Sequence, residues 1–206
     1  MKTNALALLL MTVLCVSCNN SKTNTSTTII TEKIAENDKE QIEKLIRDVN
    51  SWGNSEKGTS GITYFTIDEK TGISTGVDIK KHQLELEKLK KSDYFSADFI
   101  ENFNQIGLKL DQMIKTKAIS DWKPNEEIGP FGDSSPWCNC QEGGDMKKIQ
   151  IKIIDLNDQK GSLSWTWSEP DYSKGFEYKF NVVKENGKWK IAYLEGFDFK
   201  SNTIIE

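Results

Sequence analysis

Apolar and polar residues alternate in four short runs between Lys147 and Phe199. Successive side chains of a strand point to opposite faces of a sheet, so each run predicts a strand with one apolar face. The apolar positions of the four runs are Ile149, Ile151 and Ile153; Leu163, Trp165 and Trp167; Phe176, Tyr178, Phe180 and Val182; and Trp189, Ile191 and Tyr193. Turn residues separate the runs. This stretch therefore predicts a four-stranded antiparallel sheet.

The dipeptide Asn186-Gly187 sets the expected register of the last two strands. It favours a two-residue hairpin loop, because both central residues of that turn need positive φ. The pairs expected on this basis are Glu185 with Lys188, Val182 with Ile191, Phe180 with Tyr193, Tyr178 with Glu195 and Phe176 with Phe197. The register places Glu195, a carboxylate, on the aromatic face of the sheet. The alternative is that Gly196 bends the strand and Glu195 reaches solvent at the sheet edge.

Helical periodicity dominates the chain before the sheet. Asn37 followed by Glu40 matches a capping box and predicts the start of a helix that Gly53 ends. A charged helix is expected from residue 79 to 91, and a third helix begins at the cap Ser96 and crosses the sheet. The expected core stripes of the first and third helices are Ile42, Leu45, Ile46, Val49 and Trp52, and Phe99, Phe103, Ile106, Leu110, Met113 and Ile114.

Two glycine-rich segments interrupt this pattern. Residues 53–76 contain a short β-prone run, and a small hairpin is expected to turn at residues 70–72. Residues 122–145 form a long connection rich in glycine and proline, a kind of loop that tends to be functional or disordered. Its aromatic residues, including Trp137, favour packing over disorder.

The N-terminus indicates where in the cell the protein is located. Lys2 precedes a short apolar run that ends at Ser17-Cys18. This pattern resembles the lipobox of bacterial lipoproteins, and the resemblance implies that Cys18 is acylated after cleavage. We expect a signal peptide at 1–17, a flexible tether at 18–36 and a single domain at 37–206. A plain secretory signal is the alternative. Under either interpretation Cys15 is lost with the leader.

Charge narrows the range of partners. The formal net charge is −4, and no run of lysine and arginine stands out. Nucleic acid is therefore not expected as a partner. Two kinds of partner remain. One is a membrane, which the protein contacts through the N-terminal lipid and not through surface charge. The other is an unidentified small ligand or protein.

Candidate metal and cofactor chemistry is sparse. Cys138 and Cys140 are separated by one residue, whereas zinc sites usually need wider spacing and further ligands. In a cell envelope these cysteines are either packed thiols or a labile disulfide. Asp133, Glu142 and Asp145 could hold calcium but are expected in a solvated acidic loop. No cofactor or metal site is predicted.

The chain has a single histidine, and its sequence context disfavours the common catalytic residue sets that use histidine. His82 lies among Lys80, Lys81 and Gln83 and is expected to be a solvated surface residue. No Ser/His/Asp set, phosphate loop or nucleophile elbow is present. An enzyme would therefore depend on carboxylates.

Helices followed by a curved sheet that ends in residues 183–191, VKENGKWKI, resemble nuclear transport factor 2-like lipoprotein domains. Residues 130–133, PFGD, are placed similarly to a loop of that family. The resemblance implies an α+β cone with N-terminal helices packed on a curved four-stranded sheet. It also implies a pocket between sheet and helices, but no agreed catalytic set. Cystatin-like inhibitors share a related sheet.

These observations predict a lipid-anchored envelope protein that binds a ligand or protein without catalysis. Its pocket is expected between the sheet and residues 96–117. The expected lining residues are Glu195, Tyr178, Tyr193, Trp165 and Trp167. One alternative is an enzyme of the same fold that uses Glu195 as acid or base. Another is an immunity or inhibitor lipoprotein directed against a secreted toxin. The sequence identifies no ligand, partner or oligomeric state.

Overall fold

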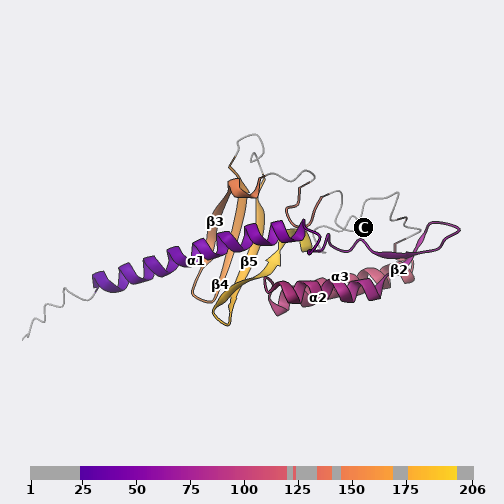
Figure 1. Ribbon diagram of the computed structural model, residues 1–206, viewed down its shortest axis with the longest axis horizontal. Coiled ribbons are helices and arrows are strands. Elements are labelled where there is room, and N and C mark those ends of the chain that lie inside the picture. The colour runs from indigo at the N-terminus through magenta and orange to yellow at the C-terminus, as the bar shows by residue number, and fades with distance from the viewer. Residues whose placement is uncertain (1–23, 120–122, 124–133, 141–144, 169–175, 199–206) are drawn as a thin grey trace, which may run out of the picture. The chain divides into compact units, whose positions relative to one another are not determined.

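The computed structural model describes residues 24–119, 123, 134–140, 145–168 and 176–198 (Figure 1). The chain divides into two compact units, residues 1–34 and residues 35–206. The elements in chain order are α1 (Asn24–Gly53), β1 (Phe65–Ile67), β2 (Ser74–Val77), α2 (Ile79–Ser92), α3 (Ala97–Lys115), the 3₁₀ helix η1 (Met146–Lys148), β3 (Ile149–Leu156), β4 (Lys160–Trp167), β5 (Tyr178–Glu185), β6 (Lys188–Leu194) and the 3₁₀ helix η2 (Glu195–Phe197). The fold is α+β, with three α-helices and a four-stranded antiparallel sheet, as predicted.

The four-stranded sheet has the strand order β3-β4-β5-β6, and every neighbouring pair is antiparallel. The turn after β5 places Asn186 and Gly187 at φ values of 52° and 78°, as its sequence requires. Glu185 pairs with Lys188 and Val182 with Ile191. The predicted register is therefore confirmed next to the turn.

Further from the turn, the predicted register is wrong. A bulge leaves Ala192 unpaired, so Tyr193 pairs with Asn181 and Phe180 pairs with Leu194. Leu194 is fully buried and occupies the core position expected for Tyr193. β6 then ends, and Glu195 begins η2 instead of pairing with Tyr178.

The first helix begins earlier than predicted. α1 starts at Asn24, inside the segment predicted as a tether, so the expected helix start at Asn37 is wrong. Neither glycine nor proline occurs between Asn24 and Trp52, so no residue in that stretch breaks the helix. Its end at Gly53 agrees with the prediction. Within the second unit Asp38 accepts hydrogen bonds from Trp189 Nε1 (3.0 Å) and Lys184 Nζ (2.8 Å), which fix α1 to the sheet.

The predicted helical stripes form the core. Buried members are Ile42, Leu45, Ile46 and Val49 of α1, and Phe99, Phe103, Ile106, Leu110 and Ile114 of α3. Ser96 caps α3 as predicted, and its hydroxyl accepts the Phe99 N–H at 3.2 Å. The hairpin predicted around residues 70–72 is present as β1 and β2.

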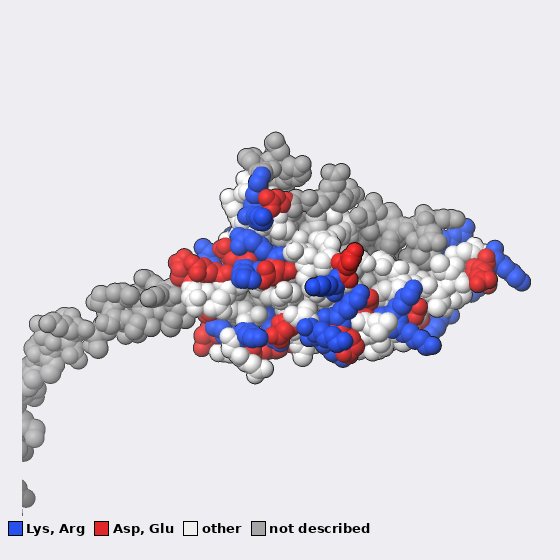
Figure 2. Space-filling model, in the orientation of Figure 1, with Lys and Arg blue, Asp and Glu red and all other residues white. Residues whose placement is uncertain are grey.

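α2 and α3 lie side by side (Figure 1). None of the helices within the described residues is long and apolar enough to cross a bilayer. On the face drawn in Figure 2, basic and acidic side chains are interspersed over the surface.

Candidate functional site

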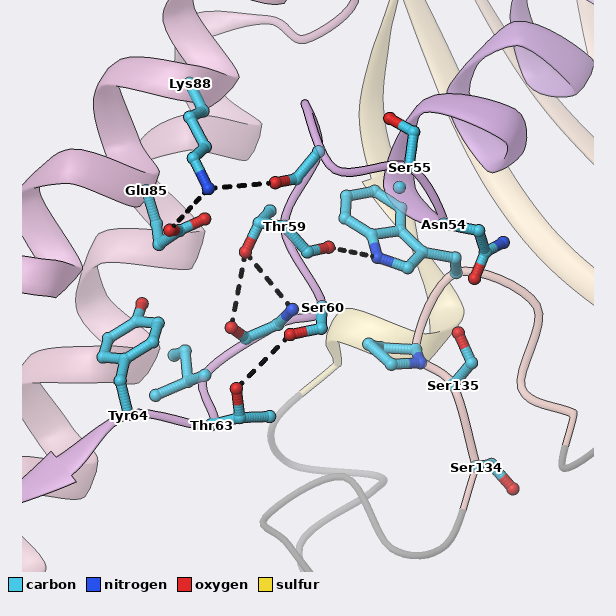
Figure 3. Close-up of a pocket in the computed structure, with 16 residues that line it drawn as sticks. Asn54, Ser55, Thr59, Ser60, Thr63, Tyr64, Glu85, Lys88, Ser134 and Ser135 are labelled. Atoms are coloured by element: carbon cyan, nitrogen blue, oxygen red, sulfur yellow. Dashed lines mark hydrogen bonds and ion pairs between the residues drawn. The ribbon is translucent and has the colours of Figure 1, made fainter.

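The candidate site is a cavity of about 590 Å³ on the helical side of the second unit (Figure 3). Its walls come from three segments: residues 53–64, which follow α1; residues 85 and 88 of α2; and residues 134–137. The first and last segments are far apart in sequence. The cavity therefore depends on contacts that hold two loops together.

Trp137 holds these loops together. Its ring is 2% exposed, and its Nε1 donates to the Thr59 carbonyl at 2.7 Å. Asn50 donates to the Trp137 carbonyl at 3.4 Å. A Cβ on Gly53 would lie 2.5 Å from the Trp137 ring, so only glycine allows this approach at the end of α1. The prediction that Trp137 packs is confirmed.

The cavity wall is rich in small hydroxyl side chains. The hydroxyl residues that line it are Ser55, Thr59, Ser60, Thr63, Ser134 and Ser135. Part of this wall is organised internally: Ser60 Oγ lies 3.3 Å from Thr63 Oγ1, and Thr59 Oγ1 accepts the Gly61 N–H at 3.3 Å. These groups keep free lone pairs or protons, so the wall suits a polar ligand.

Among the described residues that line this cavity, Glu85 and Lys88 are the charged ones. Lys88 Nζ donates to Glu85 Oε1 at 2.8 Å and to the Gly58 carbonyl at 3.2 Å. Glu85 Oε2 is buried and has no hydrogen-bond partner within the described residues. A buried acceptor without a partner costs roughly 1–3 kcal/mol, and more if it is charged. The Glu85 side chain is 16% exposed, so part of it faces the cavity while Oε2 itself is buried.

Tyr64 adds a second polar group to this wall. Its hydroxyl lies 2.8 Å from Nδ1 of His82. Burial and the nearby charge of Glu85 raise the pKa of Tyr64 above its usual value. The phenol is therefore neutral at pH 7, and the hydrogen bond to the histidine fixes its oxygen on the cavity wall.

His82 is fully buried, so the prediction of a solvated surface histidine is wrong. Its ring stacks on Phe103 of α3, with centroids 5.7 Å apart. A Cβ on Gly107 would lie 2.3 Å from His82 Cε1, so this glycine makes room for the ring. The sequence did contain a signal, because His82 shares helical spacing with the buried Leu86 and Leu89.

Burial lowers the pKa of His82 below 6.5 because it disfavours the charged ring. The nearby Asn104 partly offsets this lowering of the pKa, although its side-chain oxygen forms no hydrogen bond within the described residues. His82 Nε2 and Asn104 Oδ1 therefore lack hydrogen-bond partners within the described residues.

The residues predicted to line a pocket lie mainly in the core. Trp165, Trp167 and Tyr178 are 1%, 7% and 0% exposed. Trp165 stacks on Tyr178, and the Tyr178 hydroxyl donates to the Pro136 carbonyl at 2.7 Å. These side chains support the sheet and have almost no surface to offer a ligand.

Tyr193 and Glu195 lie elsewhere. Tyr193 lines a second cavity of about 460 Å³ beside α3, together with Phe197. Glu195 Oε2 accepts the backbone N–H of Lys179 at 2.8 Å, where β6 has ended. Glu195 lines neither of these two cavities.

Of the cysteines and acidic residues considered for a metal site, the structure describes Cys138, Cys140 and Asp145. Cys138 and Cys140 form a disulfide, which decides between the two states that the sequence left open. Asp145 caps η1 by accepting the Lys147 N–H at 3.0 Å. Cys18, Asp133 and Glu142 lie outside the described residues. Within the described residues, no group of three metal-binding side chains occurs.

The chain matches no protein-family model, no curated protein and no solved structure.

Proposed function

We propose that this protein is held in a bacterial cell envelope by a lipid on Cys18 and binds a small polar ligand without catalysis. The N-terminal pattern of Lys2, a short apolar run and Ser17-Cys18 supports the anchor. The cavity walled by residues 53–64, 134–137 and α2 supports the ligand site. The membrane is then reached through the lipid, and the ligand through the folded domain.

The observation that carries the ligand site is the Glu85–Lys88 ion pair, whose partly exposed side chains line a cavity rich in hydroxyl groups. Because the two charges neutralise each other, this corner has no net charge. It therefore favours a neutral ligand that brings an O–H or N–H donor. The surrounding hydroxyl groups extend the match to a compound with several hydroxyl or amide groups.

We also propose that the domain is related to nuclear transport factor 2-like lipoprotein domains. The order of helices followed by a four-stranded antiparallel sheet supports this relation. The cavity differs in position from the pocket implied by that resemblance, because aromatic side chains fill the space expected for the pocket. The ligand site would then be a particular feature of this chain.

The two cavities do not support the enzyme alternative. Glu195 was its proposed acid or base, and its carboxylate accepts the Lys179 N–H and lines neither cavity. The immunity or inhibitor alternative has no contact that favours it. Ligand binding is therefore the function that the geometry supports best.

The test compares ligands that remain bound when the protein is purified from its native envelope. Native mass spectrometry would detect a small molecule on the wild-type protein. Glu85→Gln replaces an acceptor oxygen with an NH₂ donor and should weaken binding about tenfold to hundredfold, the value of a hydrogen bond to a charged group.

Glu87→Gln is a matched control. Glu87 lies on the same helix and pairs with Lys90 at 2.9 Å, just as Glu85 pairs with Lys88 at 2.8 Å, but it faces solvent. This variant should retain the ligand. Equal occupancy in the wild type and Glu85→Gln would show that the cavity is not the ligand site.

A further inference from the structure

The two edges of the four-stranded sheet differ. The outer edge of β6 is covered, because Ser96 N–H donates to the Ile191 carbonyl at 2.9 Å and Ile191 N–H donates to the Tyr94 carbonyl at 2.8 Å. β3 is the opposite edge, and no described strand pairs with its outer side. An uncovered edge presents free backbone donors and acceptors to another strand.

β3 also exposes apolar side chains. Ile153 is 39% exposed and Ile154 is 56% exposed. They are flanked by Lys152 and Asp155, which are both exposed as well. Asp155 has no ion-pair partner within the described part of the chain. Lys152 lies on the same outer surface as Glu177 and helps to lower the pKa of that carboxyl.

A bulge in β3 changes which side chains share a face. Ile153 pairs with Leu163 and Asp155 pairs with Ser162, so Ile154 is an extra residue. In a regular strand, Lys152 and Asp155 would point to opposite faces, since they are three residues apart. The extra residue brings Asp155 to the polar face, where Lys152 opposite Ser164 also lies.

The bulge makes the edge self-complementary. If two copies run antiparallel about a two-fold axis between residues 153 and 154, the residues on either side of the bulge meet partners on their own face. Lys152 of each copy then lies opposite Asp155 of the other, and Ile151 lies opposite Leu156. A shift by one residue would set Ile153 opposite Asp155 and lose both matches.

We propose that two copies of this chain associate through antiparallel pairing of their β3 strands, with Ile153 of one copy opposite Ile154 of the other. The pairing continues each sheet into the next copy and removes the free edge. It is isologous, so each charge pair occurs twice and the assembly closes at two copies. This inference does not depend on the ligand proposed above.

The test measures the mass of the full chain, purified in mild detergent, by size-exclusion chromatography with multi-angle light scattering. The wild type should have twice the mass of one copy at high micromolar concentration. Lys152→Asp places like charges opposite each other at two sites and should raise the dimer dissociation constant about tenfold or more. Asp155→Lys should do the same.

The double variant Lys152→Asp/Asp155→Lys restores opposite charges across the two-fold axis and should regain dimerisation. Lys179→Asp is the control, because it reverses an exposed lysine on the inner strand β5. Circular dichroism would establish that each variant is folded. A monomeric wild type, single variants that dimerise as well as the wild type, or a double variant that stays monomeric would each overturn the proposal.

Discussion

Acidification should destabilise this protein between pH 7 and pH 5 through His82. The ring is fully buried, and burial lowers its pKa below 6.5. The unfolded chain therefore binds more protons than the folded chain when the pH is below about 6.5. Stability from this residue is complete above that pH and is lost as the pH falls toward the folded-state pKa.

The size of this effect has an upper limit. A ring that stays neutral in the folded protein loses at most about 2 kcal/mol at pH 5, which is the free energy that protonation of one ordinary histidine gives the unfolded chain. A ring that is partly protonated in the folded protein gives a smaller loss. The ring stacks on Phe103 and leaves no room for a Cβ at Gly107, so close packing favours its neutral form.

The assay is urea unfolding at several pH values between 5 and 7.5. His82 is the only histidine in the chain, so few other groups titrate in this window. His82→Gln removes the titrating group, and the difference between the two proteins isolates its contribution. The single histidine also gives one resolved ring signal for a direct NMR titration.

Two results would refute this reasoning. One is a parallel dependence of the free energy of unfolding on pH in the wild type and in His82→Gln. The other is an NMR titration of the folded protein with a pKa of 6.5 or above. Either would mean that the ring carries its proton as easily in the fold as in water.

Two further predictions concern the cysteines. Cys18→Ala should release the protein from membranes into the soluble envelope fraction, whereas Cys15→Ala should stay bound; a Cys18→Ala protein that still pellets with membranes after a carbonate wash would contradict the anchor. The double variant Cys138→Ser/Cys140→Ser should melt within a few degrees of the wild type, because the disulfide spans only two residues of sequence and closes a very small loop. A much larger fall, measured by circular dichroism, would show that this link supports the fold.

Local patterns predicted the regular elements well. Alternation located the four strands, and the periodicity of Ile42, Ile46, Phe99 and Phe103 located the core faces of α1 and α3. The register failed at Ala192, because a bulge is decided by which side chain fills the core, and Leu194 fits there better than Tyr193. One inserted residue was enough to remove the predicted pairing of Glu195 with Tyr178.

The candidate site was not predictable in the same way. Its walls are loops, and loops carry no periodicity from which a contact can be inferred. The pairing of Trp137 with Thr59 joins residues 78 positions apart, and only the fold brings them together. The role of Gly53 follows from that contact alone, since its sequence context reads only as the end of a helix.

The hydrogen bond between Trp137 and Thr59 also has a consequence for the order of events during synthesis. Helix α1 and the loop after it are synthesised long before residue 137. The hydrogen bond between Asp38 and Trp189 joins residues that are 151 positions apart, so it forms later still. Closing such long loops is slow, because their entropy is lost before the contacts form. The cavity wall therefore cannot be completed before residue 137 has been synthesised, and a shorter nascent chain would lack it.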